Sequence, residues 1–344
     1  MKLHSLLGAL GAPTQDAEEE TFELFAQELP SQNLGFIDSK ATTLDLTVAG
    51  RDLAIHQSPG VLSSNRAGGT TGAVVWKITP LFAEWLSSPS NPLFVHGVLS
   101  HSSLVVELGC GIAGLVALLL APRIAGYLLT DQPYVAKLVD QNVRENWRTA
   151  VSAPTSSSRA SKSSSAVLGT SPTPSKTRRG SLAAGASGGG ARRGRLKETA
   201  GGDDNRIRFT PLDWETDRVT PVLLTKFGWS SPGGEANRSF DVVLACDCIY
   251  NEALVDPFVS TCVDLCRLRV AEREKEQEDG EPCVCVVAQQ LRDPLVFEAW
   301  IKRFSRSFHT WRVPDPLLAE GLKSNSGFVV HIGVLKDDIS LDAI

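Results

Sequence analysis

Four acidic side chains follow predicted strands at the point where each strand ends. Glu107 closes the apolar run at residues 104–106, Asp131 follows residues 126–130, Asp213 follows residues 206–212, and Asp247 follows residues 240–245. In an open α/β sheet, ligands bind outside the carboxyl ends of the strands. Each acid alone also fits a helix cap, a turn or an exposed position, but their joint placement predicts one shared site.

Three glycines follow Glu107 with the spacing Gly109-x-Gly111-x-x-Gly114. A glycine turn between a strand and a helix lets the backbone approach a nucleotide-type ligand closely. The spacing matches the dinucleotide fingerprint, which is a weak signal alone. A carboxylate two residues before the first glycine suits a cationic amino group better than a pyrophosphate. S-adenosyl-L-methionine is such a ligand, and Asp131, about 20 residues beyond the turn, can hold its ribose hydroxyls.

Two tryptophans, Trp76 and Trp214, are expected close to these strand ends. Either one alone is best interpreted as a core aromatic. Beside a strand-end site, the pair can instead flank an adenine ring or a methionine chain.

Alternating strands and helices predict an α/β fold with a doubly wound, Rossmann-like, seven-stranded sheet. A hairpin at residues 42–55 and a helix at 80–86 precede this core, so residues 1–100 are predicted to form an N-terminal extension packed on a domain at 101–344. Strands are expected at 104–108, 126–131, 206–212, 240–245, 283–288, 308–313 and 328–335, and helices at 134–147, 255–276 and 295–304.

The predicted domain is interrupted at residues 150–205, which are rich in Ser, Gly, Arg and Ala and nearly lack large apolar side chains. Such a segment cannot bury enough surface to offset its ordering entropy, so we predict that it is disordered. Its basic character fits a weak electrostatic contact with RNA or a ribosome. It also fits a tolerated insertion without a task, or an error in the gene prediction.

Composition excludes several classes of protein. The chain has 344 residues, a net charge of −5 and 42% hydrophobic residues, which predicts a sizeable core and no direct nucleic-acid readout. No apolar run approaches the roughly 20 residues that span a bilayer, so no membrane partner is expected. The N-terminal patch MKLHSLLGALGAP fits a signal peptide poorly, because an acidic run follows it.

Seven cysteines include three close pairs, Cys246/Cys248, Cys262/Cys266 and Cys283/Cys285. A Cys-x-Cys pair on a strand places both thiols on one face. None of these pairs has the spacing of a four-ligand zinc site, so no metal is expected. We interpret them as reduced core cysteines of a cytoplasmic or nuclear protein.

These motifs resemble a known family. The sequences ELGCGIAG at 107–114, TDQ at 130–132, LDW at 212–214 and DCIY at 247–250 resemble class I, seven-β-strand S-adenosylmethionine-dependent methyltransferases. In particular they resemble protein-lysine methyltransferases with an Asp-x-x-Tyr motif after the fourth strand, as does TGAVVWKITPLFAEWL at 71–86. LACDCIYNE at 244–252 is similar to the fungal members that act on the L1-stalk protein of the large ribosomal subunit. The resemblance covers residues 40–150 and 205–340.

The resemblance implies a protein substrate in the large ribosomal subunit, with Asp247 and Tyr250 facing the lysine. It assigns cofactor contacts to Trp76, Gly109, Cys110, Gly111, Asp131, Trp214, Ala245 and Cys246. Glu107 joins these cofactor contacts because of its place before the glycine turn, and the enzyme is expected to be a monomer. The chain departs from the pattern in its long insertion and in Cys246, where relatives often carry a small residue.

Methyl transfer from a sulfonium requires a neutral amine, whereas free lysine has a pKa near roughly 10.4. A desolvated channel lowers that pKa and a carboxylate opposes the shift. We therefore expect Asp247 to position the amine and Tyr250 to contact it through its ring or hydroxyl.

Two other classes remain open. One is a nicotinamide oxidoreductase that uses the glycine turn and Asp131, although no Tyr-x-x-x-Lys pair is evident. The other is a methyltransferase fold that binds a partner without catalysing a reaction.

Overall fold

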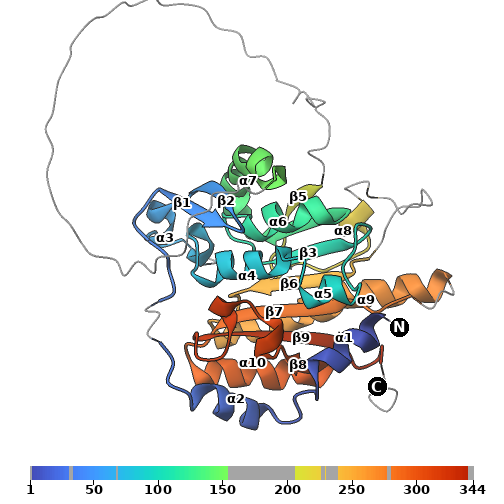
Figure 1. Cartoon of the computed structure of the whole chain (residues 1–344). Coiled ribbons are helices and arrows are strands. Elements are labelled where there is room, and N and C mark those ends of the chain that lie inside the picture. Colours follow the sequence, from blue (N-terminus) through green and yellow to red (C-terminus); the bar gives the residue numbers. More distant parts are fainter. Residues whose placement is uncertain are drawn as a thin grey trace, which may run out of the picture. The chain divides into compact units, whose positions relative to one another are not determined.

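The structure is a computed structural model that describes residues 2–30, 34–66, 69–153, 206–225, 229, 239–276 and 280–339 (Figure 1). All of these residues belong to one unit. Of the predicted insertion at 150–205, residues 154–205 lie outside the described residues. The first positions of that stretch are part of the fold, because helix α7 (Ala136–Val151) continues through Ala150, which is fully buried.

A seven-stranded sheet forms the centre of the molecule, as the alternation of strands and helices predicts. Its strands are β3 (Leu104–Leu108), β4 (Gly126–Asp131), β5 (Ile207–Pro211), β6 (Val242–Cys246), β7 (Val284–Gln290), β8 (Phe308–Arg312) and β9 (Phe328–Leu335). They lie in the order β5-β4-β3-β6-β7-β9-β8. The first five strands in this order, β5, β4, β3, β6 and β7, are parallel to one another. Strand β9 is antiparallel to both of its neighbours, β7 and β8.

This strand order distinguishes between the predicted classes. A dinucleotide-binding sheet has the order 3-2-1-4-5-6. Here the last strand, β9, lies between the fifth and sixth strands of the sheet and runs against them. The inserted antiparallel strand is the feature that a nicotinamide oxidoreductase of the ordinary Rossmann type lacks.

Two hydrophobic cores cover the two faces of the sheet, because successive strand residues point to opposite sides. Val105 and Tyr127 belong to one core, whereas their neighbours Val106 and Leu128 belong to the other. The first core is completed by α1 (Lys2–Leu10), α4 (Ile78–Ser87), α6 (Leu115–Leu120), α7 and the hairpin β1 (Thr43–Val48) and β2 (Arg51–His56). The second is completed by α2 (Ala17–Phe25), α9 (Val255–Glu276) and α10 (Pro294–Ser307).

Shorter helical segments connect these elements. They are α3 (Pro59–Leu62), α5 (Pro92–Val95), α8 (Val222–Thr225) and the 3₁₀ turns η1 (Thr71–Ala73), η2 (Ala121–Arg123), η3 (Pro133–Val135), η4 (Glu252–Leu254), η5 (Asp315–Leu317) and η6 (Glu320–Leu322).

The N-terminal apolar patch forms helix α1, which the sequence analysis did not predict. Its four leucines at positions 3, 6, 7 and 10 lie on one face and are buried in the first core. Their hydrophobicity therefore serves packing. Among the described residues, no helix is both long and apolar enough to cross a membrane.

The predicted hairpin is fastened to α7 by two buried asparagines. The Asn142 side chain accepts a hydrogen bond from the His56 amide and donates to the His56 carbonyl, and Asn146 bonds Ala54 in the same way. These amides satisfy the free edge of β2, so the N-terminal segment has a fixed position on the core.

All seven cysteines are buried and unpaired. Cys283 and Cys285 enter the same core, as predicted, but Cys246 and Cys248 enter different cores. The prediction of a shared face was wrong there because β6 ends at Cys246 and the chain turns at Asp247, whose φ is 61°. The described residues contain no cluster of His, Cys, Asp and Glu side chains that can hold a metal ion.

Candidate active site

A cavity of about 430 Å³ opens at the carboxyl ends of β3 to β6. This volume lies within the range of about 300–1,000 Å³ that is usual for small-molecule sites. The predicted site residues that line it are Trp76, Glu107, Gly109, Cys110, Gly111, Asp131, Trp214, Cys246, Asp247 and Tyr250. Ala245 does not line it, because its side chain packs in the core beneath α9 and α10.

The glycine turn is shaped to leave room in this cavity. Gly109 and Gly111 have φ values of 66° and 58°, which favour glycine. A β-carbon on Gly109 would lie 2.6 Å from the Cys248 sulfur, and one on Gly111 would lie 3.1 Å from the Gly72 carbonyl oxygen. Larger residues at these two positions would therefore strain the backbone and collide with the cavity walls.

Glu107 lies at the base of the cavity and is nearly buried, with 3% of its surface exposed. Burial raises its pKa to about 7, although the Tyr127 hydroxyl donates a 2.7 Å hydrogen bond to Oε2 and opposes that shift. Glu107 does not cap α6, because the residue at that helix start is Gly114, which has no side chain to cap with. A desolvated carboxyl in a cavity wall is well suited to a cationic ligand.

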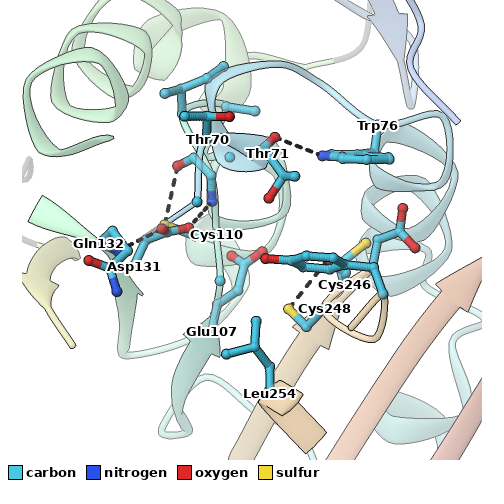
Figure 2. Close-up of a pocket in the computed structure, with 18 of the residues that line it drawn as sticks. Thr70, Thr71, Trp76, Glu107, Cys110, Asp131, Gln132, Cys246, Cys248 and Leu254 are labelled. Atoms are coloured by element: carbon cyan, nitrogen blue, oxygen red, sulfur yellow. Dashed lines mark hydrogen bonds between the residues drawn. The ribbon is translucent and has the colours of Figure 1, made fainter. Parts of the chain in front are cut away.

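Asp131 connects the end of β4 to the glycine turn. Its Oδ2 accepts a 2.7 Å hydrogen bond from the Gly111 amide, and its Oδ1 accepts one of 2.6 Å from the Gln132 amide. Burial nevertheless raises its pKa to about 6. Each oxygen keeps a further lone pair, so ligand hydroxyl groups can still bind. Figure 2 shows Asp131 and Gln132 on one side of the cavity and Cys246 and Cys248 on the other.

Asp247 is held by an arginine that the sequence analysis missed. Arg292 donates from Nη1 to Oδ1 at 2.7 Å and from Nη2 to Oδ2 at 2.5 Å, and the Gln290 amide donates to Oδ1 at 3.2 Å. The carboxylate does not cap the following turn, because Asn251 caps η4. Gln290 is the last residue of β7 and Arg292 lies two residues beyond it, so the strand-end rule would have found them had it been extended to the fifth strand.

A segment N-terminal to the core closes over the glycine turn. The Ile112 amide donates to the Gly72 carbonyl at 2.9 Å. The Trp76 indole donates to the Thr71 carbonyl at 3.1 Å, as Figure 2 shows. Tyr250 is hydrogen-bonded to the Thr71 side chain, and burial raises its pKa, so the phenol stays protonated at neutral pH. The sequence alone gave no sign that residues 69–73 cross the site.

Three thiols in the cavity wall are expected to be unreactive. Burial raises the pKa of Cys110, Cys246 and Cys248 well above the ordinary value, and nearby carboxylates add to the shift. A neutral, buried thiol is a poor nucleophile. The polar chemistry of the cavity therefore belongs to its carboxyl groups and Tyr250.

The charge of the cavity indicates its ligand. Its described lining holds five carboxyl groups, those of Glu107, Asp131, Asp213, Glu215 and Asp247, and no Lys, Arg or His. A pyrophosphate would be repelled here, whereas an ammonium and a sulfonium are favoured. Trp214, which also lines the cavity, has a buried indole N–H without a partner among the described residues.

The strand order and this acidic cavity define a class I, S-adenosylmethionine-dependent methyltransferase, and S-adenosylmethionine is its methyl donor. Residues 56–157 match the sequence profile of a family described as lysine methyltransferase. The chain is 27% identical to ribosomal lysine N-methyltransferase 5 of Zygosaccharomyces rouxii, over 78% of this chain and 75% of that protein. It is 25% identical to the protein of the same name from Candida glabrata, over 80% of this chain and 84% of that protein. The chain is thus a protein-lysine N-methyltransferase, as the motifs predict.

Other similarities are shorter or more distant. A diaminohydroxyphosphoribosylamino-pyrimidine deaminase of Schizosaccharomyces pombe is 33% identical over 38% of this chain, but the match spans only 31% of that protein. The N-methyltransferase NodS from Bradyrhizobium japonicum, solved with S-adenosyl-L-homocysteine, has a TM-score of 0.30 at 10% identity, over 68% of this chain and 78% of that one. The strand order, and not this distant structural likeness, defines the fold.

Proposed function

We propose that this enzyme methylates a lysine of a large-subunit ribosomal protein, with Asp247 and Tyr250 at the acceptor side of the cavity. The observation that carries the proposal is the acidic cavity, which lacks cationic side chains in its described lining. Tyr250 belongs to that lining and is 39% exposed, so it connects the cavity to the surface. The ribosomal substrate is supported by the names of the yeast relatives.

The remaining cavity residues divide the donor between them. Glu107 would pair with the ammonium, Asp131 would accept bonds from the ribose hydroxyls, and Trp76 and Trp214 would pack against the apolar parts. Gly109 to Gly111 and Cys246 would line the donor without adding charge. When bound, S-adenosylmethionine supplies an electrophilic methyl group on a sulfonium, whose sulfur keeps the carbon–sulfur electron pair.

The acceptor amine must arrive without its extra proton. Asp247 would orient it through the lone pair that remains on Oδ2, and Tyr250 would form one side of the channel. After transfer the methylated nitrogen carries a positive charge, and the proton that it releases would pass to water. Holding the amine and the methyl group in line would supply most of the acceleration.

The cellular context follows from the same proposal. A ribosomal substrate would be met in the cytoplasm or the nucleus. We also expect the enzyme to act as a monomer and without a membrane partner. Residues 1–100 would act as an extension that completes the site of the domain at 101–344. The basic insertion would contact RNA only weakly and electrostatically.

An assay of methyl incorporation tests the proposal. Large ribosomal subunits from a strain lacking this enzyme are incubated with labelled S-adenosylmethionine and with wild-type or Asp247→Asn enzyme. We expect labelled lysine with wild type and a loss of at least tenfold with the variant, while calorimetry shows retained cofactor binding. Because Arg292 loses its counter-ion, the variant should also unfold with a free energy lowered by about 1–3 kcal/mol. Full labelling by the variant would reject the role of Asp247.

A further inference from the structure

Arg292 is fixed by contacts on every side. Besides its two bonds to Asp247, its Nη2 donates to Gln290 Oε1 at 2.9 Å and its Nε donates to the Leu34 carbonyl at 3.4 Å. The guanidinium carbon also lies 4.9 Å from the centre of the Trp76 ring. Such a set of contacts is typical of a permanent part of a site and not of a side chain that leaves when a ligand enters.

Arg292 acts from outside the cavity. Asp247 and Trp76 line the cavity, but Arg292 does not. The guanidinium therefore lies behind the carboxylate and does not occupy the place of a substrate amine. Oδ1 of Asp247 already accepts two hydrogen bonds, from Arg292 and the Gln290 amide, whereas Oδ2 accepts one from Arg292 among the described residues. One acceptor position thus remains on Oδ2.

An unpaired carboxylate at this position would hinder the reaction. A negative charge within about 4–6 Å of an amine favours its protonated form and raises its pKa by about 1–3 units. A protonated amine has no lone pair with which to attack a methyl group. The arginine cation, in direct contact with the carboxylate, offsets that charge while leaving the oxygen able to accept an N–H bond.

We propose that Arg292 is a fixed counter-ion that cancels the charge of Asp247, so that the acceptor lysine enters as the free amine. This inference rests on the proposed function and deepens it by naming a residue that sets the protonation state of the substrate. Arg292 is a positioning residue, because it acts through Asp247. The other titratable groups that line the cavity are Glu107, Cys110, Asp131, Asp213, Glu215, Cys246, Cys248 and Tyr250, and the Tyr134 hydroxyl lies close to Gly72 in the cavity wall.

The pH dependence of kcat tests the counter-ion role. It is measured with large ribosomal subunits as substrate and saturating S-adenosylmethionine, for wild type, Arg292→Met and Arg292→Lys. We expect the acidic limb of the pH–kcat profile to move to higher pH by about one pH unit in the Met variant, with kcat partly restored at alkaline pH. The Lys variant should keep the wild-type acidic limb but reach a lower maximal kcat. A lysine retains the positive charge but loses the bidentate hydrogen bonds to Asp247.

A matched control is available on α10. Arg303 is also paired with an aspartate, Asp256, and its side chain is 24% exposed compared with 20% for Arg292. Arg303→Met should leave both the limb and the plateau unchanged. The double variant Asp247→Asn/Arg292→Gln removes both charges, so its limb should return to the wild-type position with a reduced plateau. If Arg292→Met fails to fold, the single variant Arg292→Gln removes the same charge, and its limb should move up in the same way.

The outcomes separate the two proposals. Loss of activity by the same factor at every pH in the variant that lacks only the Arg292 charge, with its acidic limb unmoved, would overturn the counter-ion role. An unchanged profile would also overturn it. Wild-type enzyme that fails to label the subunits would instead reject the proposed substrate.

Discussion

Three acids in this cavity show how one type of side chain acquires three tasks from its surroundings. Glu107 has a phenol as its partner, Asp131 has two backbone amides, and Asp247 has a guanidinium. Burial raises the pKa of the first two, whereas the third is neutralised by a fixed cation. The arrangement therefore offers a titratable acid for a cationic donor and a charge-balanced one for an acceptor that must be neutral.

The raised pKa of Glu107 predicts that binding of S-adenosylmethionine releases a proton. With a pKa of about 7, it is mostly protonated at pH 6, and an arriving ammonium would favour the ionised form. S-adenosylmethionine should bind about tenfold more weakly at pH 6 than at pH 8. Calorimetry in two buffers with different ionisation enthalpies should detect the release of most of one proton at pH 6.

The same shift affects the stability of the ligand-free protein. Because the folded protein holds this proton to a pH of about 7 and the unfolded chain only to about 4.5, the free energy of unfolding should fall as the pH rises between these values. Glu107→Gln should remove this slope and most of the proton release. Proton release that is identical in the variant would show that another group responds to the donor.

At the scale of elements, the site depends on the contact between the segment at residues 69–76 and the glycine turn after β3. The hydrogen bond from Ile112 to Gly72 fixes their separation. Residues just after the hairpin hold the end of the segment, because the Ser58 amide donates to the Ala73 carbonyl and the Gln57 side chain accepts from the Val75 amide. The N-terminal elements are therefore structural parts of the cavity.

Gly72→Ala tests this contact. Its added β-carbon would lie 2.9 Å from the Tyr134 hydroxyl and 3.5 Å from Asp131 Oδ2, inside the donor side of the cavity. We expect S-adenosylmethionine affinity to fall by about 1–3 kcal/mol, the usual cost of overpacking. Gly60→Ala is the control, because nothing lies within 4 Å of its added β-carbon. Equal affinities for the two variants would contradict the predicted closure over the donor.

Much of this framework was predictable from the sequence, because strands and helices have strong periodic patterns. The seven strands and the helix at 255–276 lie where the pattern places them, and strand-end acids led to the cavity. The partners of those acids were not predictable. Tyr127 reaches Glu107 from inside a neighbouring strand, and Asp247 takes a positive φ that its residue type does not require. Such features depend on strand register and tertiary contacts.

At the scale of the whole molecule, both faces of the sheet are covered by described elements from before and after residues 154–205. Ala150 ends the buried part of α7 and β5 begins at Ile207, so described residues on both sides of the intervening segment contribute to the cores. The composition of that segment predicts that it adds no packed core.

Replacement of residues 154–203 by a short Gly/Ser linker tests this prediction. We expect the melting temperature and donor affinity to match those of the full chain, because the composition of the segment predicts no packed core. If the basic segment attaches the enzyme to RNA, the linker variant should label ribosomal subunits less than the full chain does at low salt. The two proteins should label them equally at high salt. A large drop in melting temperature would show that the segment packs on the fold.

The identity of the methylated atom tests the central claim most directly. Large ribosomal subunits from a strain lacking the enzyme are incubated with the wild-type protein and S-adenosylmethionine that carries a deuterated methyl group, and their proteins are mapped by tandem mass spectrometry. We predict deuterated methyl groups on the side-chain nitrogen of a lysine in a large-subunit protein, and at least tenfold fewer of them with Asp247→Asn. Label found only on RNA, on arginine or on a chain terminus would contradict a cavity built to admit a neutral lysine amine.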